Sequence, residues 1–375
     1  MKFLHLSDLH IGKIVNDFSM LEDQKFILDQ IIRLAQTRKA DAVLLAGDIY
    51  DRAIPSGEAV LLLDNFLTAL AESGIKVYMI SGNHDSAERI SFGEAVFAKE
   101  DIYIGGVYKG ALPVFFQKDE WGEVEFVLLP FMKPAQADTS TSQEAVAKLL
   151  EAYEKERIAA KREGRRVLIT HYFITDAGRE PELSDSETTV HVGGLDQVDA
   201  GLFQGFDYVA LGHIHKRQQI GEKPVYYAGS PLKYSFGETL QTKSVYWVEL
   251  DEKGLAKVEM CPLRPMREMR KVKGSLNEIM ENALSEGPAR DDYIQAILTD
   301  KEELIDPMGT LRSVYPNIMQ IVKEDFEPEV RDGVTRKMIQ KKEPLVLFEE
   351  FFQLVRGEAM SEEERKVMEQ IVREL

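Results

Sequence analysis

The sequence contains a single cysteine, Cys261, and no long uninterrupted apolar run. One cysteine excludes an internal disulfide framework and is typical of a protein from a reducing compartment. The apolar stretch at the N-terminus is too short for a signal peptide, and no segment approaches the ~20 apolar residues of a membrane span. We therefore expect a cytoplasmic protein in which Cys261 is an ordinary small core residue.

Positive charge is also scarce, because 46 Lys and Arg residues stand against 64 Asp and Glu residues, giving a formal net charge of −18. This balance argues against a protein that captures nucleic acid by simple electrostatic attraction. Any nucleic-acid binding must therefore use a local surface, bound metal ions or a basic surface on a partner. The hydrophobic fraction of 44% is ordinary for a globular protein.

Short apolar runs alternate with longer amphipathic segments over the first two-thirds of the chain, which is the pattern of an α/β domain. Apolar spacing and capping residues predict helices over residues 24–36, 56–73 and 143–163. The predicted strands are 3–6, 42–46, 77–80, 126–130, 167–170, 208–211, 225–228 and 245–250.

The character of the chain changes near residues 262–274, where a basic stretch leads into a second helix-and-strand pattern. We predict a main domain over residues 1–265, a small α+β module over 266–342 and a helical tail over 343–375. The apolar residues of the tail repeat at helical spacing, so the tail either packs on the parent body or docks onto helices of a partner. The basic stretch contains Arg264, Arg267, Arg270, Lys271 and Lys273.

Five short segments place metal-binding types of side chain directly after predicted strands. Because ligands bind at the carboxyl ends of strands in open α/β sheets, we expect these segments to converge. Imidazole, carboxylate and amide donors without thiolates suit manganese, iron or zinc rather than a structural zinc or a calcium site. Five of the seven histidines lie in these segments, whereas His5 and His191 do not. The predicted ligands are Asp8, His10, Asp48, Asn83, His171, His213 and His215.

The ordered motifs SDLH, GDIYD, GNHD, TH and GHIH resemble the calcineurin-like metallophosphoesterase superfamily over about residues 1–262. This resemblance implies a four-layer α/β/β/α sandwich that holds two divalent metal ions. Within the superfamily, GSPLKYSFGE at residues 229–238 and DDYIQAILTD at residues 291–300 are similar to segments of nuclease subunits from double-strand-break repair complexes.

The closer resemblance implies a metal-dependent DNA nuclease that acts in repair and recombination. It implies 3′→5′ exonuclease activity on duplex DNA and endonuclease activity on single strands or hairpins, together with an ATPase subunit. The module over residues 266–342 would then be a DNA-facing cap, the tail would bind the ATPase subunit, and the chain would form a homodimer within a heterotetramer.

The resemblance also divides the ligands between two metal ions, for which manganese is the expected element. His84, beside Asn83 but outside the ligand set, is expected to stabilise the transition state or to protonate the leaving oxygen. Asp51 and Asp85 are candidates to orient His84 or a ligand imidazole. One ion is assigned to Asp8, His10, Asp48 and His215 and the other to Asp48, Asn83, His171 and His213, so that Asp48 bridges the pair.

Basic residues beside the motifs are candidates to contact phosphates, although a solvated surface role stays open for each of them. Two other functions also stay open: a phosphatase or cyclic-nucleotide phosphodiesterase with the same chemistry, and a non-catalytic scaffold of the same fold. The extra module and the GSPLKYSFGE segment disfavour the first, and the complete ligand set disfavours the second. The candidate phosphate contacts are Arg52, Arg89, Lys216 and Arg217, together with residues 264–273.

Overall fold

The computed structural model describes residues 1–184, residues 196–324 and single positions between 345 and 368. The chain divides into two compact units, Met1–Lys323 and Glu324–Leu375. In the second unit the described positions Leu345, Phe348, Glu349 and Phe352 are helical. Most of the predicted helical tail, and the predicted module beyond residue 324, lie outside the described residues.

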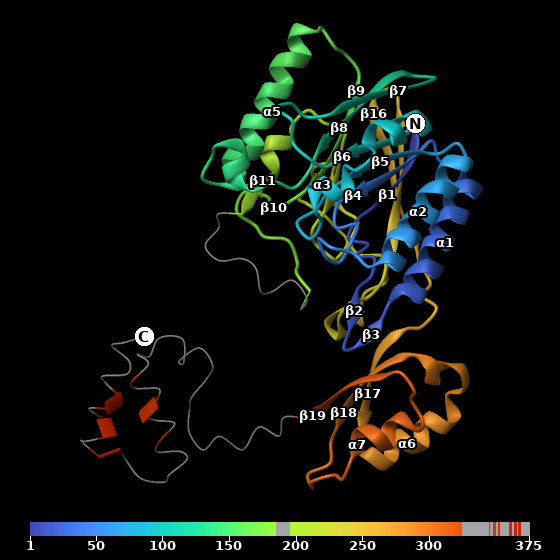
Figure 1. Ribbon diagram of the computed structural model, residues 1–375, viewed down its shortest axis with the longest axis vertical. Helices are drawn as coiled ribbons and strands as arrows, with labels where there is room; N and C mark the ends of the chain where they lie inside the picture. The colour runs from blue at the N-terminus through green and yellow to red at the C-terminus, as the bar shows by residue number, and fades with distance from the viewer. Residues whose placement is uncertain are drawn as a thin grey trace. The chain divides into compact units, whose positions relative to one another are not determined.

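The first unit contains two six-stranded sheets, and both are mixed (Figure 1). In the first sheet β1, β4, β5 and β6 are parallel, whereas β15 runs antiparallel to β1 and forms a hairpin with β16. In spatial order its strands are β16 (Gly254–Pro262), β15 (Ser244–Asp251), β1 (Lys2–Leu6), β4 (Ala42–Ala46), β5 (Lys76–Ile80) and β6 (Ile102–Gly105).

The second sheet has a parallel centre and antiparallel edges. Strands β14, β12, β9 and β8 are parallel, and β13 and β7 close the two edges. In spatial order its strands are β13 (Gln218–Gln219), β14 (Val225–Tyr227), β12 (Tyr208–Gly212), β9 (Arg165–His171), β8 (Gly122–Leu129) and β7 (Val114–Asp119).

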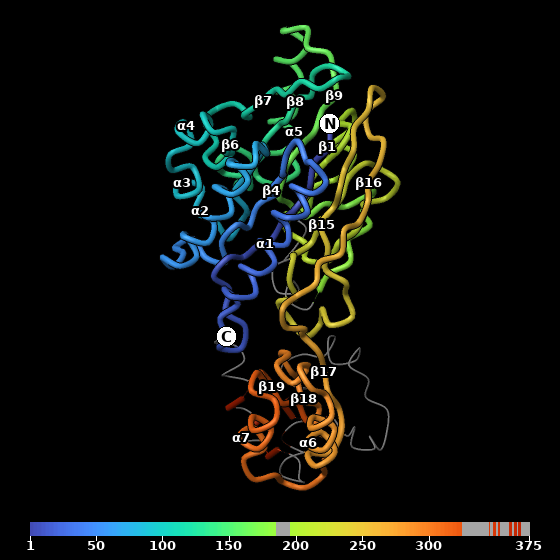
Figure 2. The backbone as a smooth tube through the Cα atoms, turned by 90° about the vertical axis from the view of Figure 1, so that its right-hand side faces the viewer, coloured from blue at the N-terminus to red at the C-terminus, as the bar shows by residue number. Residues whose placement is uncertain are grey.

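The two sheets pack face to face, and helices cover their outer faces (Figures 1 and 2). Successive side chains of a strand point to opposite faces of its sheet. Each strand therefore contributes side chains both to the core between the sheets and to the core beneath the helices. Phe3 packs with Phe126 and Tyr208 between the sheets, while Leu4 packs beneath α1 (Leu21–Arg38) and α2 (Gly57–Glu72). Helix α5 (Ser142–Ala159) covers the second sheet. The predicted α/β fold is therefore confirmed, with layers in the order helix, sheet, sheet, helix.

A smaller three-stranded parallel sheet follows β16 along the chain, and its two helices lie between its strands in sequence (Figure 2). The end of the basic stretch forms its first strand, which the sequence did not predict. The elements are β17 (Met269–Gly274), α6 (Leu276–Ser285), β18 (Tyr293–Leu298), α7 (Pro307–Arg312) and β19 (Ile318–Lys323).

The first unit also contains shorter strands and α-helices. They are β2 (Ile14–Val15), β3 (Phe18–Ser19), α3 (Ala87–Ile90), α4 (Glu94–Phe97), β10 (Phe173–Thr175) and β11 (Gln197–Asp199). Among the helices of the described part of the chain, none combines the length and the apolar character needed to cross a membrane.

Candidate metal centre

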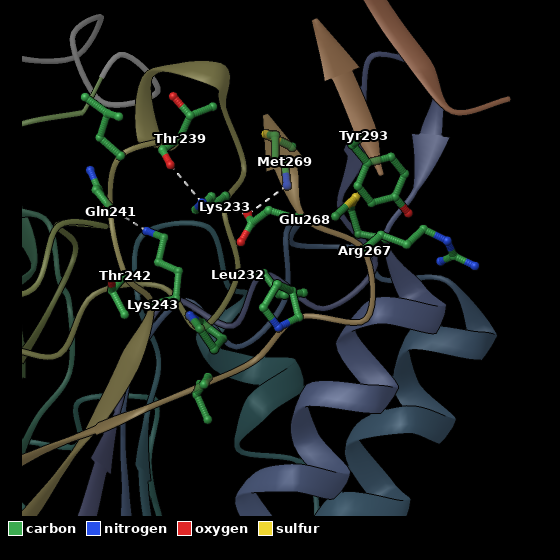
Figure 3. Close-up of a pocket in the computed structure, with 15 residues that line it drawn as sticks. Leu232, Lys233, Thr239, Gln241, Thr242, Lys243, Arg267, Glu268, Met269 and Tyr293 are labelled. Carbon is green, nitrogen blue, oxygen red and sulfur yellow. Dashed lines mark hydrogen bonds and ion pairs between the residues drawn. The ribbon is translucent and has the colours of Figure 1, made fainter. Parts of the chain in front are cut away.

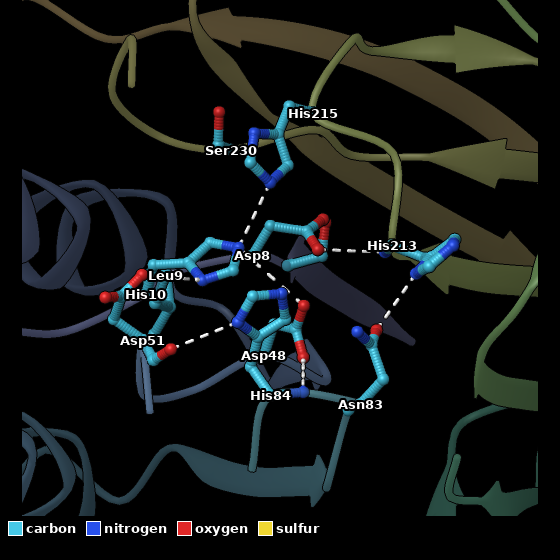
Figure 4. Close-up of polar contacts among 12 residues, drawn as sticks. Asp8, Leu9, His10, Asp48, Asp51, Asn83, His84, His213, His215 and Ser230 are labelled. Carbon is cyan, nitrogen blue, oxygen red and sulfur yellow. Dashed lines mark hydrogen bonds and ion pairs between the residues drawn. The ribbon is translucent and has the colours of Figure 1, made fainter. Parts of the chain in front are cut away.

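The carboxyl ends of three parallel strands in the first sheet and two in the second bring the seven predicted ligands together. Figure 4 labels all of these ligands except His171. Strands β1, β4 and β5 supply ligands from the first sheet, and β9 and β12 supply ligands from the second. Five ligand side chains form a buried floor, whereas Asn83 is exposed and His213 is partly exposed. The cluster is therefore accessible to solvent at Asn83 and His213. The buried ligands are Asp8, His10, Asp48, His171 and His215.

Asp48 lies at the centre of this cluster. Its Oδ2 atom is 3.3 Å from Nε2 of His171 and 3.7 Å from Nε2 of His10. Its Oδ1 atom accepts a hydrogen bond of 2.9 Å from the backbone N–H of His84. One carboxylate therefore faces imidazoles supplied by both sheets, which is the geometry required of a ligand shared by two metal ions.

On one side of Asp48, donor atoms of Asp8, His10 and His215 all lie within 4.8 Å of one another. The Nε2 atoms of His10 and His215 are only 3.0 Å apart. A second group of donors within the same limit consists of Asp8, Asp48 and His171, so Asp8 also reaches toward the other side.

On the opposite side of Asp48, the Oδ1 atom of Asn83 lies 3.0 Å from Nε2 of His171 and 3.0 Å from Nδ1 of His213. Figure 4 shows the contact between Asn83 and His213. His84 lies next to Asn83, and its ring meets that of His10 edge-on with centroids 4.8 Å apart. One nitrogen of His84 also lies within 4.8 Å of donor atoms of His10 and Asp48. The structure therefore brings His84 into the cluster, at its exposed side.

The backbone is strained at several ligand positions. Asp8, His10, Asp48 and His213 have φ angles of 53°, 44°, 48° and 100°. Residues with side chains rarely adopt this left-handed region, and each such residue costs of order 1–3 kcal/mol. Gly82 is required nearby, since a Cβ there would overlap the carboxylate of Asp48. Strain concentrated at ligand positions favours a functional site over a structural histidine cluster.

Partners outside the cluster orient its imidazoles. The Nδ1–H of His171 donates to the carbonyl oxygen of Ala46 at 2.7 Å, which turns Nε2 toward Asp48. The Nδ1 atom of His10 is 3.6 Å from the carboxylate of Asp51. Asp51 also accepts a hydrogen bond of 3.0 Å from Nδ1 of His84, but through its backbone carbonyl. The two expected roles of Asp51 are therefore divided between its side chain and its main chain.

Asp85 supports the site through the backbone. Its carboxylate accepts hydrogen bonds of 3.0, 2.9 and 2.8 Å from the N–H groups of Ile49, Tyr50 and Gly82. These bonds join the turn after β4 to the turn after β5. Burial, the largest cause, and the nearby Asp48 charge raise the pKa of Asp85 to about 6.

The donor set fits divalent cations. Among the described residues, Oδ2 of Asp8 and Nδ1 of His10 are buried without a hydrogen-bond partner. Burial raises the pKa of Asp8 to about 6, although the nearby imidazoles of His171 and His215 oppose the shift. Burial lowers the pKa of His171, but the charge of Asp48 outweighs it and raises that pKa to about 9. Bound cations would stabilise these buried carboxylates and take up the free oxygen.

The candidate phosphate contacts differ in their surroundings. The side chain of Arg52 is 74% exposed, and its Nε atom is 3.7 Å from the carboxylate of Asp51. Arg89 is also exposed, on α3. Lys216 forms an ion pair with Glu182, which offsets its charge. Arg52 and Arg89 are therefore the more available cations.

Two arginines of the basic stretch form internal ion pairs. Arg267 donates to Asp23 at 2.6 Å, and Arg270 donates to Asp292 at 2.8 Å. The guanidinium of Arg217 lies over an aromatic ring at 6.0 Å from its centroid. Because ion pairing offsets the charges of Arg267 and Arg270, these two residues hold the fold together rather than form a free basic surface.

Several supporting residues were not predicted as part of the site. The side chain of Gln24 donates to the carbonyl oxygens of Leu9 and His10, and the Tyr234 hydroxyl donates to Leu9. Glu238, a buried carboxylate, lies beside His215. Tyr234 and Glu238 belong to the GSPLKYSFGE segment, whose family resemblance could have indicated that they support the site. Gln24 gave no such indication, because it resembled any polar residue of a helix.

Comparisons with known proteins agree with this geometry. The model of the calcineurin-like phosphoesterase family matches residues 1–217, and a model described as the type 5 capsule protein repressor C-terminal domain matches residues 265–356. A relative from Staphylococcus epidermidis, named as the SbcD subunit of the nuclease SbcCD, is 30% identical over 96% of this chain and 95% of its own length. The protein of the same name from Staphylococcus saprophyticus is 30% identical over 99% and 98%.

Proposed function

The chain belongs to the calcineurin-like phosphoesterase family, and from this premise we propose that it is a metal-dependent DNA nuclease, the SbcD-type component of an SbcCD-type complex. The observation that carries the proposal is the convergence of Asp48 and six other donor side chains from two sheets. The similarity to SbcD nuclease subunits over almost the whole chain supports DNA as the substrate.

Two divalent ions, manganese in this proposal, would occupy the centre. When bound, they supply Lewis-acid activation of the phosphodiester and of the attacking water. Asp48, between the imidazoles of both sheets, is the shared ligand. One ion would be held by Asp8, His10, Asp48 and His215, and the other by Asp48, Asn83, His171 and His213.

His84 is proposed as the residue that meets the reacting phosphate. Because the carbonyl oxygen of Asp51 can only accept, Nδ1 of His84 carries the proton of their 3.0 Å hydrogen bond. Nε2 is then the atom that holds or releases a proton. The exposure of His84 leaves this atom accessible to a substrate, so His84 can protonate the leaving oxygen or stabilise the charged transition state.

The substrate would lie across the exposed side of the centre. Arg52 and Arg89 are the proposed phosphate contacts there, with Lys216 and Arg217 as weaker candidates. We further propose that residues 266–342 form the cap that faces DNA. The proposed activities are 3′→5′ exonuclease activity on duplex DNA and endonuclease activity on single strands and hairpins.

A homodimer through the main domain is part of the proposal. Exposed apolar side chains on and near α2, α3 and α4 support this surface, since monomeric proteins rarely expose a contiguous apolar patch. Phe92, the most exposed residue of this group, is 83% exposed. The group consists of Ile54, Val60, Leu61, Phe92 and Val96.

An SbcC-type ATPase subunit is the proposed second partner, bound by residues 343–375 in a cytoplasmic heterotetramer. A chain ending at Lys342 should still cleave a small phosphodiester but fail to co-purify with the ATPase subunit. The full-length chain purified alongside is the control. Retention of the ATPase subunit by the shortened chain would contradict the assignment.

One assay tests the proposed activity directly. Protein loaded with manganese is offered end-labelled duplex DNA, hairpin DNA and a small phosphate monoester, with and without the ATPase subunit. We expect DNA cleavage that stops when the metal is chelated. Rapid monoester turnover with intact DNA would identify a phosphatase instead, and less than one metal ion per chain would identify a non-catalytic scaffold.

A further inference from the structure

The segment that follows the GHIH motif encloses the backbone of His215. The N–H of Ser230 donates to the carbonyl oxygen of His215 at 3.2 Å. Gly229 has a φ angle of +76°, and a Cβ there would lie 2.6 Å from the same oxygen. Figure 4 shows Ser230 beside His215, on the side of the ring away from His10. This segment therefore fixes the position of His215, and its contacts continue to the side chain.

A buried ion pair lies behind the imidazole of His215. The Oε1 atom of Glu238 is 3.8 Å from Nδ1 of His215, and its Oε2 atom is 2.5 Å from Nζ of Lys243. Lys243 also donates to the carbonyl oxygen of His215 at 3.0 Å and to Oγ of Ser230 at 2.9 Å. Both side chains of the pair are buried, so desolvation offsets much of their attraction. A purely structural contact would be served equally well by apolar side chains of similar volume.

The orientation of the His215 ring indicates a role for the ion pair between Glu238 and Lys243. Nε2 of His215 lies 3.0 Å from Nε2 of His10, inside the donor cluster, while Nδ1 faces the carboxylate of Glu238. A carboxylate beside the outer nitrogen favours the tautomer with the proton on Nδ1 and leaves the lone pair on Nε2. The outer contacts of a histidine ligand set both its tautomer and its affinity for metal.

We propose that Glu238, held in place by Lys243, is a positioning residue that fixes His215 as an Nε2 metal ligand. The inference rests on the proposed two-metal function and deepens it. Glu238 contacts the donor cluster through His215, whereas Ser235, which donates to its Oε1 atom at 3.1 Å, and Lys243 lie outside the predicted ligand set. Its effect is therefore confined to the ion that His215 would bind, which is the property that separates a positioning role from general stabilisation.

Lys243 borders a cavity of about 220 Å³ (Figure 3). There the amide oxygen of Gln241 accepts a hydrogen bond of 2.9 Å from Lys243. Leu232 and Met269 are among the other lining residues. The lysine is thus held from three sides, by Gln241, Ser230 and Glu238, and this restraint keeps the carboxylate of Glu238 beside His215.

The test compares manganese binding by the native protein and by Glu238→Gln, using titration calorimetry of the metal-free protein. Loss of an outer-shell partner costs about 10- to 100-fold in metal affinity. We expect one of two manganese ions to bind about 10- to 100-fold more weakly to Glu238→Gln, with the other unchanged. Unchanged binding of both ions, or equal weakening of both, would overturn the proposal.

Asp119→Asn is the matched control, because Asp119 forms another largely buried ion pair, with Arg165 at 2.5 Å. Asp119 also binds the amino group of Met1, at the opposite end of β1 from Asp8. This variant should lower the unfolding temperature and leave both manganese affinities within about twofold. Selective weakening of the same ion by Asp119→Asn would also overturn the proposal, since the effect would then be one of general stability.

The native protein provides a second measurement if Glu238→Gln does not fold. Nitrogen-15 chemical shifts of the histidine rings in metal-free protein report the tautomer, and His215→Asn identifies the His215 signal. We expect the proton of His215 on Nδ1; a proton on Nε2 would contradict the positioning role. Failure of the native protein to bind manganese would reject the proposed function, whereas normal native binding with an unaffected Glu238→Gln would reject only the role of Glu238.

Discussion

The buried floor of the candidate metal centre and its rim, by which we mean the candidate phosphate contacts Arg52, Arg89 and Lys216, differ in how firmly their side chains are held. On the floor, His171 donates to a backbone carbonyl, and Asp48 bonds to the backbone of His84. On the rim, Arg52 is largely exposed and has only a long contact of 3.7 Å with Asp51. Fixed donors suit chemistry that needs precise ligand geometry. Exposed cations suit a polyanion that is bound through its phosphates along its length.

Because of this difference, we expect substitutions on the floor to reduce catalysis strongly and substitutions on the rim to reduce substrate binding only slightly. Floor residues would hold the proposed metal ions, and the loss of the shared ligand Asp48 would affect both ions and the chemistry that depends on them. Rim residues contribute single phosphate contacts that add separately. The largest effects should therefore follow changes at Asp48, and the smallest should follow changes at exposed arginines.

Asp48→Asn should have the largest effect, because it removes one of two negative charges on the floor and the ligand that both ions would share. We expect loss of metal-dependent DNA cleavage together with loss of tight manganese binding at both positions. Metal content after dialysis, combined with cleavage of end-labelled duplex, provides the measurement. Two firmly bound manganese ions in Asp48→Asn would show that the carboxylate is not shared.

His84→Ala should separate chemistry from metal binding. His84 lies on the exposed side of the cluster and is proposed to act on the phosphate, so both manganese ions should remain bound. General acid catalysis contributes about 10²- to 10⁴-fold, and cleavage should fall by that factor. Single-turnover cleavage at saturating manganese measures it. Normal turnover with full metal occupancy would remove His84 from the mechanism.

The floor of the site was predictable because each ligand follows an apolar strand. A buried parallel strand is a continuous apolar run, and its carboxyl end is marked by the change to glycine and polar residues. Strand β4 was predicted with its observed ends, and Asp48 follows it after one glycine. Strand order then brings β1, β4 and β5 side by side, so their ligands meet without any further signal in the sequence.

The support for the site was less predictable, because it depends on contacts between residues far apart in the chain. Glu238 meets His215 across 23 positions, and Gln24 reaches back to the loop after β1. Neither contact follows from a periodic pattern. Strand β17 was also missed, because its three basic residues resembled a basic surface stretch. One of them, Arg270, instead pairs with Asp292 inside the small module.

Asp51→Asn should have an intermediate effect, since Asp51 lies between floor and rim. Its carboxylate is 3.6 Å from Nδ1 of His10 and 2.7 Å from Nζ of Lys13. Removing its charge should weaken the orientation of His10, while the backbone carbonyl that accepts from His84 is retained. We expect cleavage to fall about 10- to 100-fold, the range for outer partners of metal ligands. An effect as large as that of His84→Ala would indicate that Asp51 itself takes part in proton transfer.

Arg52→Ala and Lys216→Ala should have the smallest effects, and comparing them tests whether the rim binds DNA. If Arg52 contacts a phosphate, its removal should weaken duplex binding severalfold and reduce the salt dependence of binding by about one ion. Lys216→Ala should change binding less, because Glu182 already offsets the charge of Lys216. Fluorescence anisotropy of a labelled duplex at several salt concentrations, in a His84→Ala background that preserves the DNA, measures both. Equal salt dependence in Arg52→Ala and the parent would show that the rim of the site does not bind DNA through Arg52.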